Sequence, residues 1–184
     1  MESLYAPHTY DNTPYFSLEK THCFARVVDV YDGDTVKLIM PLPQSNPPMF
    51  FKFNCRLTGI DTSEMKSKQA ENKERAVAAR NLLITLCNKQ VEPPIGTMVN
   101  KKSIKKFFND NVCLVFVHCG AFDKYGRLLV DLYADPDSPN SFTDVLITNN
   151  MGYAYDGGKK KTEDEQAGGR TAVRLQPTVD QTRS

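Results

Sequence analysis

One long stretch without glycine or proline, residues 63–87, most constrains what this chain can fold into. Its apolar residues recur at helical spacing, for example Ala76, Ala79, Leu83 and Leu86, while charged residues occupy the other side. This pattern predicts one long amphipathic helix. Any fold proposed for the chain must place this helix between the segments with strand character that precede it and follow it.

Five segments are rich in β-branched residues or alternate apolar and polar residues, at 23–31, 34–40, 51–57, 112–118 and 127–134; these patterns predict strands. Asp32-Gly33 predicts a tight turn between the first two. Three strands before a long helix and two after it suggest an α+β, mainly β, fold. We expect a five-stranded OB-type barrel with helices packed outside it.

The domain is expected to cover residues 22–156. Residues 1–21 mix Tyr, Pro, Asn and Thr without periodicity, and we expect an extended N-terminal arm lying on the domain. Residues 157–184 contain few large apolar side chains, which predicts a flexible C-terminal tail;. Ser141 is a plausible N-cap for a short helix that ends near Asn149.

Composition constrains the partners only weakly. Lys+Arg 23 and Asp+Glu 22 give a net charge of +1, so partners must be inferred from local clusters. Five cysteines without a CxxC pair indicate free thiols in a reducing compartment;. We identify neither a signal peptide nor an apolar run of membrane-spanning length, and no sign of an obligate protein partner. The expected location is intracellular: cytoplasmic, with the nucleus also open.

The end of the third predicted strand carries the first candidate site. Arg56 lies on the face opposite Phe53 and Cys55, and Asp61 and Glu64 follow it closely. An arginine and two carboxylates in one place can hold a phosphate and a cation together. Each signal also has a simpler interpretation, since helix N-termini favour carboxylates and exposed arginines are usually only solvated.

Asp32-Gly33-Asp34-Thr35 is the second candidate, and by itself it is an ordinary hairpin turn;. A calcium loop of the EF-hand type is excluded by the spacing. The sixth position would be Lys37, where glycine is needed, and the twelfth would be Pro43, where a bidentate Glu is needed;.

Three blocks together resemble the staphylococcal nuclease (thermonuclease) family. They are Tyr-Asp-Gly-Asp-Thr-Val (31–36), Arg-Leu-Thr-Gly-Ile-Asp-Thr-Ser-Glu (56–64) and Asp-Lys-Tyr-Gly-Arg-Leu-Leu-Val-Asp-Leu-Tyr-Ala-Asp (123–135), in the order of the family. The resemblance covers roughly residues 23–155. It implies a staphylococcal-nuclease-like barrel and a calcium-dependent endonuclease. Such an enzyme hydrolyses phosphodiester bonds of DNA and RNA, prefers single-stranded or frayed substrates, and leaves 3′-phosphate ends.

The resemblance also implies a metal site. By motif match, Asp34 and Asp61 would be calcium carboxylates, and the carbonyl of Thr62 would be a further ligand. Asp32 would be an additional acid close to the ion. Calcium is a hard cation that takes carboxylate and carbonyl oxygens and leaves positions for water and a phosphate oxygen.

The implied catalytic residues are Arg56 and Arg127, which would hold the scissile phosphate, and Glu64, which would activate or position the attacking water. Arginine makes bidentate contacts with phosphate that lysine cannot make. The residues implied in substrate binding are Lys124, Tyr125 and Tyr155.

The chain also departs from the family. Ser63 stands where many members have proline, which should loosen the loop that carries Thr62 and Glu64. An insertion covers about 88–111, and its lysines could bind a phosphate backbone or simply be solvated; they are Lys101, Lys102, Lys105 and Lys106. We expect a short basic helix there.

An alternative function is a catalytically silent module of the same fold that binds nucleic acid or protein through aromatic and basic surface residues. Degenerate modules of this kind usually lose an acidic ligand or an arginine. This chain keeps Asp34, Arg56, Asp61, Glu64 and Arg127. The sequence therefore favours the enzyme.

Overall fold

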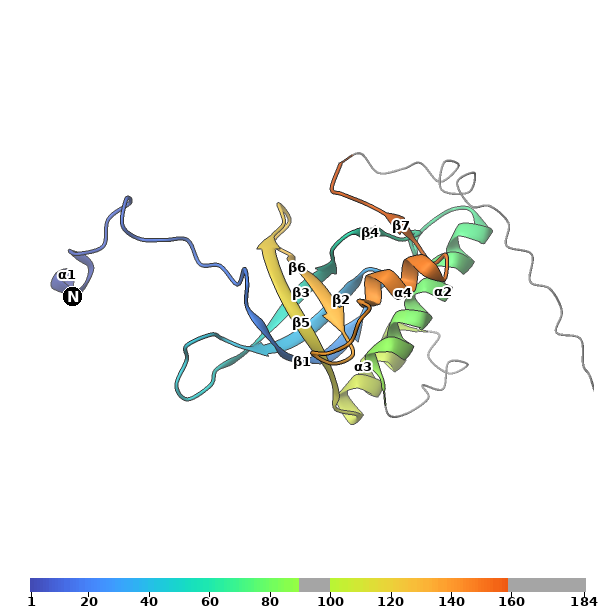
Figure 1. The fold of residues 1–184 in the computed structure, drawn as a ribbon, viewed down its shortest axis with the longest axis horizontal. Helices are drawn as coiled ribbons and strands as arrows, with labels where there is room; N and C mark the ends of the chain where they lie inside the picture. Colours follow the sequence, from blue (N-terminus) through green and yellow to red (C-terminus); the bar gives the residue numbers. More distant parts are fainter. Residues whose placement is uncertain (90–99, 159–184) are drawn as a thin grey trace, which may run out of the picture.

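The computed structural model describes residues 1–89 and 100–158. Its centre is a closed barrel with the strand order β1-β2-β3-β6-β5 (Figure 1). The barrel strands are β1 His22–Val30, β2 Thr35–Pro41, β3 Phe50–Leu57, β5 Cys113–Phe122 and β6 Leu128–Tyr133. All neighbours are antiparallel except β3 and β6, which are parallel. The expected mainly β, OB-type barrel is confirmed.

Period-two alternation fills the barrel. On β2, Val36, Leu38 and Met40 are at most 1% exposed, while the residues between them are half-buried. Val115 and Val117 of β5 point into the same interior. Burial of each such side chain is worth about 1.5–3 kcal/mol, so this core is the main source of stability. The residues between them face outward and are partly accessible to solvent and to ligands.

Three helices pack on the barrel. α2 (Ala70–Cys87) contacts β1, β5 and α4; α3 (Lys101–Asp110) packs on β1; and α4 (Phe142–Thr148) packs on β6. The expected helices at α3 and α4 are confirmed. Ser141 and Asp144 form a capping box that begins α4, because the Ser141 side chain accepts from the Asp144 backbone while the Asp144 side chain accepts from the Ser141 backbone;.

The long helix begins at Ala70, so the prediction of a start near Ser63 was wrong. Ser67 explains the delay: its Oγ accepts a hydrogen bond from the Gln69 backbone at 3.1 Å, and Gln69 has an extended conformation. Such local side-chain bonds compete with helical ones. Residues 62–69 are therefore free to form a loop in which Thr62 and Ser63 are buried.

The N-terminal arm does not lie on the domain as expected. Residues 1–17, which include the short α1 (Glu2–Tyr5), are all exposed, and Figure 1 shows them running away from the barrel. Firm contact begins at Leu18, which is 2% exposed, and at Lys20, whose backbone N–H donates to the Cys119 carbonyl. Leu18 is the arm's one buried apolar side chain, and nearer the N-terminus the exposed Phe16 ring lies 6.4 Å from the Phe122 ring of β5.

Three further expectations concern the cysteines, membrane-spanning helices and the two segments at 90–99 and 159–184. All five cysteines are free, as predicted, and only Cys23 is less than fully buried. Within 1–89 and 100–158, no helix has the length and apolar character needed to cross a membrane. Residues 159–184, most of the expected tail, and 90–99 of the insertion lie outside the described residues.

Candidate active site

Arg56 occupies the centre of the site at the end of β3. Its side chain is buried, and Nη1 donates to Asp34 Oδ1 at 2.8 Å. Nη2 donates to Asp61 Oδ1 at 2.8 Å and to the Ile60 carbonyl at 3.1 Å. One guanidinium thus joins the β1–β2 turn to the segment after β3. The interpretation of Arg56 as a merely solvated residue is excluded.

Asp34 is more than a turn residue. It is 3% exposed; Oδ1 also accepts from the Thr35 hydroxyl at 2.9 Å, and Oδ2 accepts from the Thr62 backbone N–H at 3.3 Å. Its own N–H donates to Asp32 Oδ1 at 3.2 Å. The hairpin turn therefore presents two carboxylates side by side, with one of them oriented by the loop that carries Thr62.

This arrangement disfavours the ionised form of the Asp32 carboxyl group. Burial and, after it, the neighbouring Asp34 carboxylate raise the pKa of Asp32 to about 7, against the lowering effect of hydrogen bonds from the Asp34 backbone and the Thr35 side chain. A carboxyl group with its pKa near neutrality is held in a place that disfavours its negative charge. A cation bound nearby would relieve the repulsion.

Asp32→Asn should therefore change how stability depends on pH in the presence of chelator. The folded-state pKa of about 7 lies above the ordinary 3.8. The free energy of unfolding of the wild type therefore decreases as the pH rises from about 3.8 to about 7, and it stays at the lower value above that pH;. The variant lacks this fall. Its advantage over the wild type should be greater at pH 8 than at pH 4 by at least about 1.4 kcal/mol, one pKa unit.

Urea denaturation at the two pH values measures this difference. Asp137→Asn, at an exposed position in the loop before α4, is the matched control and should show no such trend. An Asp32→Asn variant with the same pH profile as the wild type would contradict the assigned environment of Asp32.

A second, two-stranded sheet holds Asp61. β4 (Ile60–Asp61) pairs antiparallel with β7 (Tyr153–Ala154), and the Tyr153 hydroxyl donates to Asp61 Oδ2 at 2.8 Å. Gly152 allows the approach, because a Cβ there would lie 2.8 Å from the Asp61 carbonyl oxygen and 2.8 Å from Ile60 side-chain carbons. Side-chain contacts across this pair thus fix one carboxylate of the site.

Tyr153 is the residue that the sequence prediction missed. Tyr155 was expected to bind substrate, and residues two apart on a strand share a face, so the same signal implied Tyr153. The Tyr155 ring lies 5.9 Å from Arg56 Cζ and 6.5 Å from the Tyr153 ring. Both tyrosines are therefore neighbours of the Arg56 cluster.

A pocket of about 240 Å³ opens beside Arg56. It receives side chains from the β1–β2 turn, the start of β2, the end of β3, the loop at 62–66 and the residue just before β6. The predicted site residues that line it are Asp32, Asp34, Arg56, Thr62, Glu64 and Arg127. Glu64 is exposed, so its carboxylate is accessible to solvent and substrate. Asp61 contacts Arg56 but is absent from the lining.

Arg127 is turned towards Asp123 at the β5–β6 turn. Its Nε and Nη2 both donate to Asp123 Oδ2 at 2.7 Å, and its side chain is 30% exposed. Tyr125 is 72% exposed; its ring lies 5.5 Å from Arg127 Cζ and 5.1 Å from Lys124 Nζ. Lys124 and Tyr125 do not line the pocket, but they stand next to an arginine that does.

The set of metal ligands that the resemblance implies is small. Within 1–89 and 100–158, no group of three or more His, Cys, Asp and Glu side chains is arranged to hold a metal ion. The resemblance implies only two carboxylates, Asp34 and Asp61, and one carbonyl, Thr62. Calcium takes six to eight oxygens, so waters and a phosphate oxygen would complete its shell. Burial and the Asp34 carboxylate raise the pKa of Asp32, so this place disfavours a second negative charge;.

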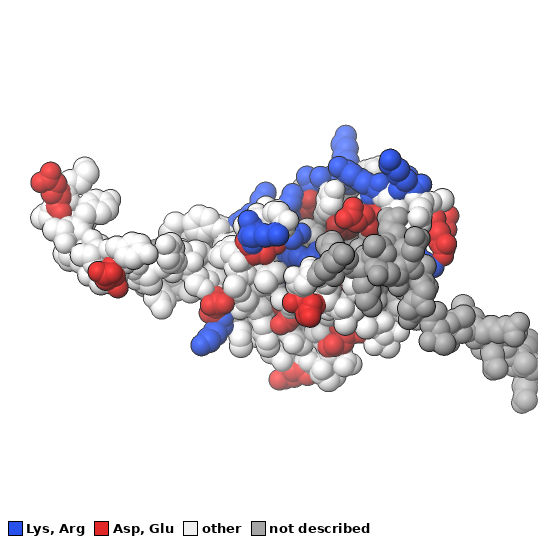
Figure 2. All heavy atoms as spheres, turned by 90° about the horizontal axis from the view of Figure 1, so that it is seen from above, with Lys and Arg blue, Asp and Glu red and all other residues white. Residues whose placement is uncertain are grey.

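Two exposed lysines lie in or near the site. Lys66 lines the pocket and is exposed, as is Lys124. Seen from the side on which β4 and β7 lie, Lys and Arg side chains gather along one edge of the domain, whereas Asp and Glu side chains are scattered (Figure 2). Such an edge attracts a polyanion.

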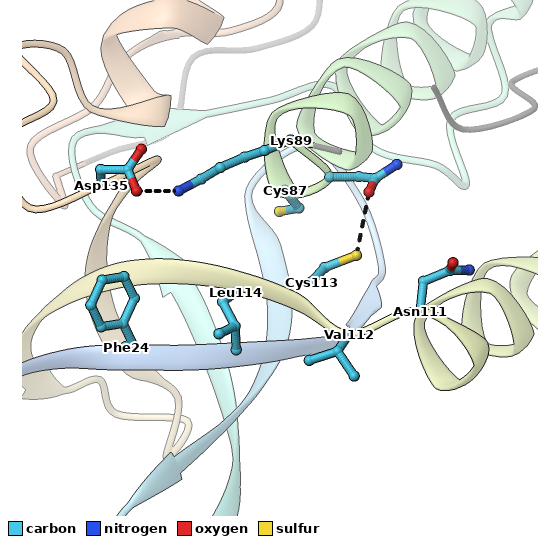
Figure 3. Close-up of a pocket in the computed structure, with 9 residues that line it drawn as sticks. Phe24, Cys87, Lys89, Asn111, Val112, Cys113, Leu114 and Asp135 are labelled. Atoms are coloured by element: carbon cyan, nitrogen blue, oxygen red, sulfur yellow. Dashed lines mark hydrogen bonds and ion pairs between the residues drawn. The ribbon is translucent and has the colours of Figure 1, made fainter. Parts of the chain in front are cut away.

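A second cavity, of about 350 Å³, lies where the end of α2 meets β1 and β5 (Figure 3). Lys89 Nζ contacts Asp135 Oδ1 at 2.7 Å, and Cys113 Sγ donates to Asn88 Oδ1 at 3.5 Å. Burial raises the pKa of the Cys87 and Cys113 thiols, which keeps both protonated and unreactive at neutral pH;. No predicted site residue lines this cavity, so the candidate chemistry belongs to the Arg56 pocket.

No protein-family model matches the chain, and no curated protein matches it. The three sequence blocks and the geometry of the pocket are therefore the observations that bear on function.

Proposed function

We propose that this protein is a staphylococcal-nuclease-like, calcium-dependent nuclease that hydrolyses DNA and RNA and leaves 3′-phosphate ends. One observation carries the proposal. Three sequence blocks far apart in the chain contribute Asp34, Arg56, Glu64 and Arg127 to one pocket of about 240 Å³. Two arginines, an accessible glutamate and buried carboxylates are the groups that phosphodiester hydrolysis needs in one place.

Arg56 retains donors for a phosphate. Its contacts within the described residues use both Nη2 hydrogens and one Nη1 hydrogen. A guanidinium has five N–H groups, which leaves Nε–H and the second Nη1–H. Arg127 would turn from Asp123 towards the same phosphate. Two guanidinium groups then stabilise the charge that builds on the phosphoryl oxygens in the transition state.

Glu64 is the proposed base. Its carboxylate would accept a proton from a water molecule as the water oxygen bonds to phosphorus and the bond to the 5′ oxygen breaks. Asp34, Asp61 and the Thr62 carbonyl would hold the calcium ion. When bound, calcium supplies positive charge beside the phosphate.

The test of this function is cleavage of labelled single-stranded DNA and RNA with calcium, with magnesium and with chelator. We expect turnover with calcium and little with magnesium, because magnesium demands tight octahedral geometry and holds its waters. Equal turnover with both ions, with trace calcium excluded, would contradict the proposed metal site.

Calcium binding can be tested without chemistry. Asp34→Ala should abolish calcium binding at the site in isothermal titration calorimetry, because it removes one of two carboxylate ligands. Asp137→Ala, at an exposed position in the loop before α4, is the control and should bind calcium like the wild type. Undiminished affinity in Asp34→Ala would show that the metal has been placed wrongly.

The ion pairs of the two arginines favour one alternative, a silent module that binds nucleic acid or protein. In such a protein, Arg56 bound to Asp34 and Asp61, and Arg127 bound to Asp123, would have only structural roles. The cleavage assay separates the two functions, since the module would bind the strands and leave them intact.

A further inference from the structure

Helix α3, inside the insertion, is firmly attached to the barrel. Ile104 and Phe108 are at most 1% exposed, and α3 packs on β1. Arg26 of β1 donates to the carbonyls of Phe108 at 3.3 Å and Asn109 at 3.1 Å. The lysines of α3 are therefore held in fixed positions relative to the strands.

One end of α3 reaches the candidate active site. Lys101 Nζ lies 5.1 Å from the centre of the Tyr31 ring, and Tyr31 lines the Arg56 pocket. Tyr31 is 40% exposed, so its ring is accessible to a nucleobase. The insertion thus places a cation and an aromatic ring at the mouth of the pocket.

A smaller pocket, of about 210 Å³, holds three more lysines. Lys37, Lys52 and Lys105 line it around Asp29, which is 2% exposed. Lys37 Nζ lies 3.4 Å and Lys105 Nζ 3.9 Å from Asp29 Oδ2, and neither Asp29 oxygen accepts a hydrogen bond from the described residues. One buried carboxylate thus lies near two ammonium groups, and three lysines around it leave the pocket with net positive charge.

The two pockets lie along the same strands. Thr35 of β2 lines the Arg56 pocket, and Lys37 and Ile39, two and four residues further on, line the lysine pocket. Alternate residues share a face, so this outer surface runs for roughly 13 Å from Thr35 to Ile39. On β3, Arg56 pairs with Thr35 and Lys52 pairs with Ile39, so the neighbouring strand follows the same path.

We propose that Lys37, Lys52, Lys101 and Lys105, here called the lysine track, bind the backbone of a single-stranded nucleic acid beyond the scissile phosphate. This inference rests on the proposed function, because the strand enters the track from the Arg56 pocket. A row of positive charges that begins at a phosphate-binding pocket and passes an exposed tyrosine suits a polyanion with stacking bases. The track would give long strands an advantage over dinucleotides.

The lysines of α3 provide a matched pair of variants. Lys101 and Lys105 are four residues apart on the side that faces Tyr31 and Asp29;. Lys102 and Lys106 form the neighbouring row, and Lys106 Nζ pairs with Asp110 Oδ2 at 2.6 Å. Two double variants remove the same charge from the same helix: Lys101→Gln/Lys105→Gln and Lys102→Gln/Lys106→Gln. Only the first removes charge from the lysine track.

The experiment measures binding of a fluorescein-labelled oligothymidylate of about 20 nucleotides in chelator, as a function of salt concentration. Lys101→Gln/Lys105→Gln should weaken binding at low salt by about tenfold and reduce the salt slope by about 1.4, since each lysine contributes about 0.7 for single strands. Lys102→Gln/Lys106→Gln should stay near the wild type. With calcium, the first variant should lose turnover on the 20-mer and keep it on dithymidine phosphate.

The outcomes separate the two proposals. If the wild type binds the oligothymidylate with this dependence on Lys101 and Lys105 but cleaves no strand, the proposed function is contradicted and the lysine track is supported. If the wild type cleaves the strand and the two double variants lose binding affinity equally, the lysine track is contradicted and the nuclease function is supported. Displacement of the oligothymidylate by poly-glutamate at equal charge concentration would identify the surface as a site for acidic polypeptide, against the proposal.

Discussion

Replacing Arg56 or Arg127 by lysine is expected to lower the single-turnover rate of DNA cleavage by about two to three orders of magnitude each. Loss of one preorganised donor to the transition state typically has an effect of this size. The ammonium group keeps the charge but cannot reproduce the fork of a guanidinium. Glu64→Gln should lower the rate with little loss of substrate affinity, because the amide cannot accept the water's proton.

Arg75→Lys is the matched control for these variants. Arg75 is a partly exposed residue of α2 that pairs with Glu71 one turn away and does not line the pocket. Circular dichroism shows whether each variant is folded. Wild-type cleavage by the folded Arg56, Arg127 and Glu64 variants would leave the chain as a binding module that only resembles a nuclease.

The second large effect concerns stability. Arg56→Met should reduce the free energy of unfolding by about 3–5 kcal/mol, the usual result of removing one partner from a buried ion pair. Asp34 and Asp61 are 3% and 2% exposed, and both lose their shared guanidinium. Urea denaturation at neutral pH in chelator measures the difference.

A triple variant isolates the electrostatic part of this loss. Arg56→Met combined with Asp34→Asn and Asp61→Asn removes the carboxylates along with the arginine, so most of the lost stability should return. A triple variant no more stable than Arg56→Met would show that the packing of the Arg56 side chain, and not its charge, holds the site together.

Much of the barrel follows from local patterns in the sequence. Period-two alternation located Phe51–Leu57, and Asp32-Gly33 located the first hairpin turn, because strands and turns depend mainly on neighbouring residues. The start of α2 was misplaced for the same reason: the pattern of residues 63–69 is helical, but the Gln69 backbone N–H donates to Ser67 Oγ, a local bond that competes with a helical one;.

The site was predictable only in part. Motif blocks identified Asp34, Arg56 and Asp61, but not that Arg56 is buried between the two carboxylates. The bond from Tyr153 to Asp61 joins residues 92 positions apart and depends on β7 pairing with β4. Long-range contacts of this kind have no local signal. The lysines of α3 were likewise equivalent in sequence, and only the packing of the helix on β1 distinguishes Lys101 and Lys105 from their neighbours.

The pairing of β7 with β4 has a consequence for the newly made chain. Synthesis proceeds from the N-terminus, and domains generally fold as their residues emerge. The five barrel strands are complete once Tyr133 has emerged, whereas Gly152 and Tyr153 follow 19 and 20 residues later. A barrel that closes during that interval would still lack the Tyr153 hydroxyl that binds Asp61. A ribosome-bound chain should therefore acquire its barrel before its complete candidate site, because β7, the last short strand to emerge, completes the second sheet and supplies the hydroxyl that binds Asp61.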